Sequence, residues 1–183
     1  WVADHTNQLV KKYDSNGKLI ETWPKDGTSH NPWLLGRAVS RRSASRHYIQ
    51  TKTGRWRAMF LHPRAVAVDK EGNVYVLEFD RGRVQKLDKN GVFKATFGAP
   101  MSTYPDTACR GRAECWNRAP GRFSMPRRIA LDLDGNVLVS DSDRIQRFSS
   151  SGSLLNSWGR RGSRPGHFQG PTGLAVGPDG RVF

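Results

Sequence analysis

Residues 24–60 contain a cluster of arginines interleaved with aromatic side chains, a combination that suits the binding of a polyanion. Guanidinium groups bind phosphate oxygens through paired hydrogen bonds, and aromatic rings stack on nucleic-acid bases. The candidate ligand-binding residues of this segment are Trp33, Arg41, Arg42, Arg46, Arg55, Trp56 and Arg57. The same residues also fit a second interpretation, a surface loop whose aromatic rings pack against its own domain.

The composition of the whole chain agrees with a polyanionic partner. Its 183 residues include 30 Lys and Arg against 16 Asp and Glu, which gives a formal net charge of +14. A charge of this size favours binding to a polyanion, although an arginine-rich solvated surface produces the same count. The distribution of the charge over the fold must therefore distinguish a polyanion-binding surface from an ordinary solvated one.

Other residues offer less chemistry. Cys109 and Cys115 lie close enough in sequence for a disulfide, which would favour an extracytoplasmic location, but two reduced thiols fit equally. No zinc-finger spacing, nucleophilic-serine motif, phosphate-binding loop or metalloprotease motif is present. The sequence thus predicts no catalytic residue, no metal and no cofactor. Its apolar runs are too short to cross a membrane, so we expect no membrane insertion.

The elements that must position these residues come from a sequence repeat. A block of apolar stretches and Gly-containing turns is complete at 63–98 and 126–159, and partial copies lie at 1–23 and 171–183. In the first complete copy the expected strands are 65–68, 74–76, 84–87 and 93–97. The small apolar residues 65–68 predict a strand buried on both faces. Repeated four-stranded antiparallel sheets indicate an all-β protein of the β-propeller class.

The turns between the first and second strands contain acidic residues followed by glycine, as in Asp132 to Gly135. Such a string resembles part of a calcium-binding loop. A hairpin turn explains it better, because the position recurs in each repeat while the acids do not, and no distal glutamate follows.

The strings VYVLEFDRGRVQKLDKNG and WVADHTNQLVKKYDSNG resemble the NHL repeat, a family that usually forms six-bladed propellers. The resemblance implies a partial ring of about three blades within 1–183. The remaining blades are expected from sequence beyond this segment, or alternatively from a homodimer. The predicted parts are the back of a blade (1–23), two blades (61–98 and 123–159), the front of a blade (168–183) and two inter-blade insertions (24–60 and 99–122).

Both insertions are expected on one face of the propeller, together with the loops between second and third strands. The predicted loops of that face carry net positive charge, and the turns opposite carry net negative charge. Arg64, Arg127 and Arg128 follow the prolines that open the blades and are expected near the mouth of the central channel. The leading hypothesis is a non-catalytic platform that binds a protein or RNA on this basic face.

An enzymatic alternative also follows from the resemblance. The peptidyl-hydroxyglycine amidating lyases are NHL-like propellers that bind zinc through histidines directly after the blade-opening prolines. Those positions hold Arg64, Arg127 and Thr172 in this chain, so the zinc ligands have no counterpart there. His62 and His167 precede the prolines at unequal distances and do not replace them.

Overall fold

The computed structural model describes residues 1–24, 48–50, 56–58, 60, 62–79, 81–98 and 119–183. The regular elements in these ranges are all strands, which confirms the predicted all-β class. Among the described residues there is no helix long and apolar enough to cross a membrane.

Three larger sheets follow one another along the chain. The first contains β1 (Val2–Asp4), β2 (Leu9–Tyr13) and β3 (Leu19–Trp23). The second contains β6 (Pro63–Val68), β7 (Val74–Glu78), β8 (Arg83–Leu87) and β9 (Phe93–Gly98). The third contains β10 (Pro126–Leu131), β11 (Val137–Asp141), β12 (Arg144–Phe148) and β13 (Leu154–Trp158). Within each sheet the strands are antiparallel and neighbours in sequence are neighbours in space, as in propeller blades.

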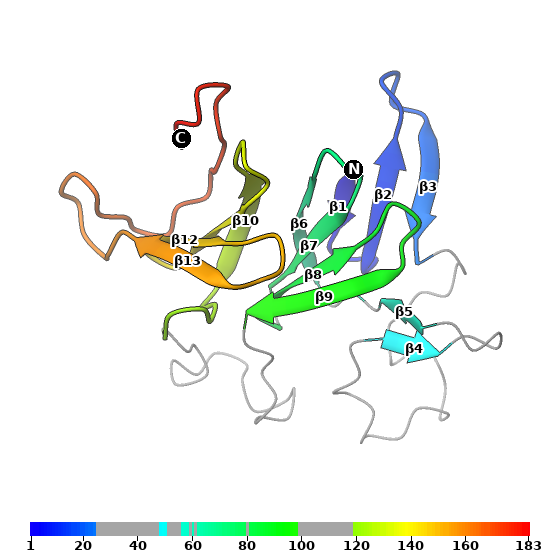
Figure 1. Ribbon diagram of the computed structural model, residues 1–183, viewed down its shortest axis with the longest axis horizontal. Coiled ribbons are helices and arrows are strands. Elements are labelled where there is room, and N and C mark those ends of the chain that lie inside the picture. Colours follow the sequence, from blue (N-terminus) through cyan, green and yellow to red (C-terminus); the bar gives the residue numbers. More distant parts are fainter. Residues whose placement is uncertain (25–47, 51–55, 59, 61, 80, 99–118) are drawn as a thin grey trace.

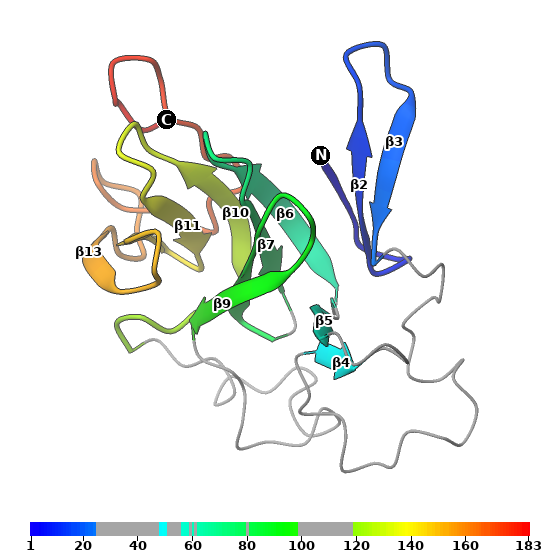
Figure 2. The same ribbon diagram turned by 45° about the vertical axis from the view of Figure 1, so that its right-hand side comes forward.

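The second sheet lies between the other two, and β6 contacts both β1 and β10 (Figure 1). Turning the molecule shows β2 and β3 of the first sheet standing apart from the other two sheets, whose inner strands β6 and β10 lie side by side (Figure 2). A fourth, small sheet pairs β4 (Tyr48–Gln50) with β5 (Trp56–Ala58), within the first predicted insertion. The pattern of residues 24–60 did not predict this hairpin.

The hydrophobic cores lie between adjacent sheets, and β7 contributes to both of them. Val74 and Val76 pack in the cluster shared with the first sheet, whereas Tyr75 and Leu77 pack in the cluster shared with the third. Successive side chains of a strand point to opposite faces of the sheet, so one strand serves both interfaces. All five residues of β7 are buried.

The prediction that residues 65–68 are buried on both faces is wrong. Ala65, Val66 and Ala67 are only partly buried, and Val68 is 38% exposed. These residues are more exposed because β6 is an edge strand, which pairs only with β7 in the described part of the sheet. In contrast, β7 has a strand on each side. The small side chains of β6 also cover less of their neighbours than the valines and tyrosine of β7.

The turns confirm the hairpin interpretation. The Gly135 N–H donates to the Asp132 carbonyl at 3.1 Å, and the Asp132 carboxylate accepts the Asn136 N–H at 2.8 Å. The same bonds recur at Asp69 and Asn73. These carboxylates therefore close the turns, because they satisfy backbone N–H groups that the strands leave unpaired.

Aromatic side chains at the ends of the outer strands hold neighbouring sheets together. Trp23 and Phe97 occupy the same position in the repeat, as does Trp158, and both are buried. Trp23 packs on Gly91 of the second sheet, and Phe97 packs on Gly152 of the third. Trp23 and Phe97 therefore serve the packing between adjacent blades.

A second aromatic position was missed in the sequence. Phe60, Phe123 and Phe168 each stand three residues before a blade-opening proline. The first two are buried, and Phe123 and Phe168 pack against Gly98 and Gly159 at the ends of the preceding outer strands. The recurrence of a phenylalanine three residues before each blade-opening proline could have identified this position in the sequence.

Candidate binding face

One end of the sheets gathers the segments that lead into the inner strands and the loops between second and third strands. The Phe79 N–H donates to the His62 carbonyl at 3.2 Å, and the Ser142 hydroxyl donates to the Ser124 carbonyl. These bonds join each entering segment to the loop of its own blade. We call this end the loop face; its described residues are 5–8, 62–64, 79, 81–82, 119–128, 142–144 and 160–172.

Both predicted insertions begin at this face. Trp23 pairs with Val10, next to the loop that joins β1 and β2. Gly98 pairs with Arg83, next to the loop that joins β7 and β8. The chain therefore enters residues 25–47 and 99–118 from the loop-face ends of β3 and β9.

The acids that end the second strands are paired with cations within the blades. Each second strand ends in an acid, namely Asp4, Glu78 or Asp141. The Lys11 Nζ lies 2.5 Å from Asp4 Oδ2, and this hydrogen bond lowers the pKa of Asp4 to about 2. Glu78 pairs with Arg83, and both side chains are fully buried. The Arg144 Nη2 lies 2.9 Å from the buried Asp141 carboxylate. These acids thus cancel little of the charge at the surface.

Arginines on the loop face are exposed instead. Arg122, Arg161 and Arg164 are exposed, and no carboxylate lies within ion-pair distance of them among the described residues. The exposed Arg64 guanidinium stacks on the Phe79 ring at 5.0 Å. Arg160 Nε donates to His167 Nε2 at 2.7 Å, which occupies one of its donors. Asp143 is the acid among the described residues of this face and is partly buried, so exposed arginines outnumber acids there.

The structure locates only part of the predicted site. Arg64 and Arg128 are exposed on the loop face, and Arg127 is partly buried with its guanidinium beside Gly170. Trp56 and Arg57 belong to β5, so their backbones pair with β4. The remaining candidates lie outside the described residues: Trp33, Arg41, Arg42, Arg46, Arg55, Cys109 and Cys115. The ligand-binding role of the whole set stays a prediction.

Two histidines meet on the loop face, which sequence spacing did not indicate. The rings of His5 and His62 stack with centroids 4.7 Å apart. They come from the β1–β2 loop and the segment before β6, whose proximity depends on the packing of the first sheet against the second. Within the described ranges, no group of three or more His, Cys, Asp or Glu side chains is arranged to hold a metal ion.

Asp141 is the acid whose ionisation the fold opposes. Burial raises the pKa of Asp141 to about 6, against hydrogen bonds from the Ser124 N–H, Arg144 and Gln146 that lower it. The folded protein therefore retains the proton to higher pH than the unfolded chain does.

We expect the free energy of unfolding to fall as the pH rises from about 4 to about 6, the range between the unfolded and folded pKa values of Asp141. The slope attributable to this group is at most about 1.4 kcal/mol per pH unit. Asp141→Asn should flatten that slope in urea unfolding experiments across this range. Asp134→Asn, which changes a side chain that is 79% exposed in the same sheet, is the control and should leave the slope unchanged.

Comparison with known proteins places the chain among repeat propellers. The NHL-repeat family model matches residues 60–87, which include β6, β7 and β8. The human NHL repeat-containing protein 3 is 25% identical over the full chain, and the rat peptidylglycine alpha-amidating monooxygenase is 30% identical over 66% of it. The chain spans 44% and 12% of these two relatives, respectively.

A solved streptogramin B lyase structure superimposes with a TM-score of 0.50. The match covers 97% of this chain and 55% of that one, at 15% sequence identity. At this identity the likeness concerns the fold alone. It agrees with a β-propeller fold, and this chain matches a part of that propeller.

Proposed function

Since this chain belongs to the NHL-repeat β-propeller family, we propose that it is a non-catalytic binding platform whose loop face contacts a partner macromolecule. The observation that supports this proposal is the separation of charge. Asp4, Glu78 and Asp141 are paired with cations inside the blades, whereas Arg122, Arg161 and Arg164 remain exposed on the loop face. Such a surface attracts polyanions by its summed field.

The chemistry of the face favours single-stranded RNA over a protein ligand. Guanidinium groups contact phosphates in pairs of hydrogen bonds, and unpaired bases stack on aromatic rings. The first insertion supplies further arginines and tryptophans in the sequence, and its ends lie at the same face. A protein ligand would instead depend mainly on one or two buried aromatic anchors such as Trp33 or Trp56.

The test is the affinity for a single-stranded RNA measured over a series of salt concentrations. We expect the affinity to fall steeply with salt, and Arg161→Gln/Arg164→Gln to weaken binding by roughly tenfold. The slope of log affinity against log salt should become shallower by about 0.7 for each phosphate that the variant no longer neutralises. The matched control is Lys70→Gln/Lys89→Gln, which removes the same charge from exposed lysines in turns at the opposite end of the sheets. The control variant should bind like the unchanged protein.

Affinity that is insensitive to salt would contradict the proposal. So would equal losses in the loop-face variant and in the control, since net charge alone would then explain binding. Neutralising Arg41, Arg42, Arg55 and Arg57 extends the test to the first insertion. If Trp33→Ala or Trp56→Ala abolishes binding of a protein ligand with little salt dependence, the loop face serves protein recognition instead.

A second candidate function is a metal-dependent lyase related to peptide amidation. The identity of 30% with the rat amidating monooxygenase over 66% of this chain favours it. Arg64, Arg127 and Thr172 at the positions after the blade-opening prolines oppose it, because none of these side chains is a usual zinc ligand. Elemental analysis of the purified full-length protein separates the candidates: stoichiometric zinc supports the lyase, and its lack supports the platform.

A further inference from the structure

The segment that follows β13 folds into a short loop on the loop face, residues 160–168, drawn in orange in Figure 1. The Phe168 N–H donates to the Arg160 carbonyl at 2.9 Å, and the Gly162 N–H donates to the Phe168 carbonyl at 3.2 Å. The Phe168 ring packs against Gly159 at the base of the loop. Backbone bonds and a ring contact thus close the loop, so its side chains start from defined positions.

Within this loop, His167 has a hydrogen-bond partner at each ring nitrogen. Its Nε2 lies 2.7 Å from Arg160 Nε, and its Nδ1 lies 3.2 Å from the Pro165 carbonyl oxygen. An arginine N–H can only donate and a carbonyl oxygen can only accept, so Nε2 must be the acceptor and Nδ1 must carry the proton. The two partners therefore assign the neutral imidazole with its hydrogen on Nδ1.

Protonation of His167 is incompatible with its contact to Arg160. The imidazolium carries a hydrogen on both nitrogens, so two donors and two positive charges would meet across the 2.7 Å contact. The imidazole ring packs against Gly162 and is only partly exposed, whereas Arg160 is exposed. The arginine side chain is therefore the partner that moves away when the histidine becomes charged.

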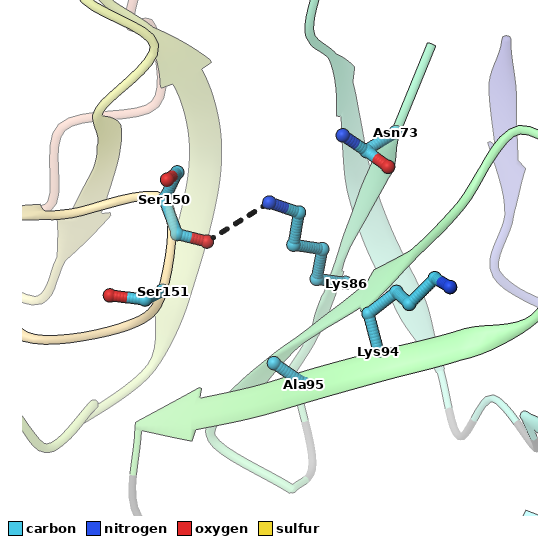
Figure 3. Close-up of a pocket in the computed structure, with 6 residues that line it drawn as sticks. All are labelled: Asn73, Lys86, Lys94, Ala95, Ser150 and Ser151. Carbon is cyan, nitrogen blue, oxygen red and sulfur yellow. Dashed lines mark hydrogen bonds between the residues drawn. The ribbon is translucent and has the colours of Figure 1, made fainter. Parts of the chain in front are cut away.

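The acceptor decides whether such a bond depends on pH. Lys86 also bonds a neutral acceptor, the Ser150 carbonyl of the next blade, at 3.2 Å (Figure 3). A backbone carbonyl takes up no proton near neutral pH, so that bond stays the same. Histidine side chains change charge between about pH 5 and pH 8, which makes the bond from Arg160 to His167 dependent on protons in this range.

The charged side chains around His167 are mainly arginines. Arg161 and Arg164 belong to the same loop and are exposed. Of the segments packed against the loop and its end, the β11–β12 loop contributes Asp143, which is partly buried, and β10 contributes Arg127. Among the described residues no carboxylate lies within ion-pair distance of His167. Protonation of this histidine thus adds positive charge where cations already prevail.

We propose that His167 and Arg160 form a proton-operated switch that sets the affinity of the loop face for single-stranded RNA, an inference that rests on the proposed function of this face. Neutral His167 holds the Arg160 guanidinium against the loop. Protonated His167 releases it, so that all donors of the guanidinium can contact phosphate oxygens. The imidazolium contributes a second cation at the same place.

The test is the affinity for one single-stranded RNA, measured by fluorescence anisotropy from pH 5 to pH 8 at constant ionic strength. We expect the unchanged protein to bind roughly tenfold tighter at about pH 5.5 than at about pH 7.5. His167→Gln keeps an oxygen that can accept from Arg160 but has no titrating ring, so most of this dependence should disappear. His5→Gln is the matched control, because it removes another histidine of the loop face, and it should retain most of the dependence.

A second measurement needs no RNA. In nuclear magnetic resonance spectra of the free protein, the Arg160 Nε–H signal should shift over the same pH range in which the His167 ring titrates. In His167→Gln the Arg160 signal should stay constant over that range.

The outcomes separate the switch from RNA binding itself. If RNA binds but His167→Gln keeps the full pH dependence, the switch is wrong and the proposed function stands. An Arg160 signal that ignores the titration of His167 would likewise overturn the switch. If RNA binds at no pH, both the switch and the proposed function are wrong.

Discussion

Replacing Gly152 with alanine is expected to destabilise the protein by about 2–4 kcal/mol. Gly152 has a φ of +96°, and a Cβ added there would lie 2.7 Å from the Phe97 Cβ and 2.8 Å from its ring. The strain of a left-handed alanine then adds to a clash between the second and third sheets. Because Phe97 is buried in the core between them, the ring has no free space to move into. Urea unfolding of Gly152→Ala measures the loss.

The repeat itself supplies the control for this experiment. Gly17 holds the same turn position in the first sheet with a φ of +81°, and a Cβ added there would have nothing within 4 Å. Gly17→Ala should therefore cost only the backbone strain, roughly 1 kcal/mol. Gly91→Ala should fall between the two, because its added Cβ would meet the Trp23 ring at 3.0 Å. If Gly17→Ala and Gly152→Ala lower the free energy of unfolding equally, Gly152 does not serve the packing between blades.

Arg83→Met is expected to lower the free energy of unfolding by about 3–5 kcal/mol. Arg83 and Glu78 are fully buried, and Glu78 Oε2 also accepts a hydrogen bond from Gln85 at 2.9 Å. Removing the guanidinium leaves a buried carboxylate without its cation, which is far costlier than losing a surface ion pair. Chemical denaturation of the variant measures the change in the free energy of unfolding.

A double variant distinguishes the charge effect from weaker packing. Glu78→Gln/Arg83→Met removes both charges, so it should be more stable than Arg83→Met alone. Lys94→Met, which breaks the exposed pair with Asp88, should change stability by no more than about 1 kcal/mol. If the double variant is less stable than Arg83→Met, the large loss comes from packing and not from an unpaired charge.

The strands and turns of the blades could be predicted because their signals are local. Asp132, Gly135 and Asn136 close a hairpin through bonds within five residues of chain, and the β-branched residues of 74–76 form a strand as expected. Recurrence of these patterns then identified the propeller class, because a single sheet of this kind cannot bury both faces alone.

The candidate site was predictable only in part. The positions of Arg64 and Arg128 on the loop face follow from their place after the blade-opening prolines, which the repeat reveals. The meeting of His5 with His62 and the reach of Lys86 to Ser150 were not predictable. Each pair joins residues from different sheets. A local sequence pattern does not predict which residues of two sheets come into contact.

The sequence by itself determined the all-β class, the blade repeat, the hairpin turns and the excess of positive charge, since all four are properties of composition or of short segments. Only the tertiary structure decided that β7 and not β6 is buried on both faces, and that the acids ending the second strands are neutralised inside the blades. Burial and charge pairing depend on which sheet packs against which. That packing also leaves arginines exposed on the loop face and brings the Lys86 ammonium within hydrogen-bond distance of the Ser150 carbonyl of the next blade.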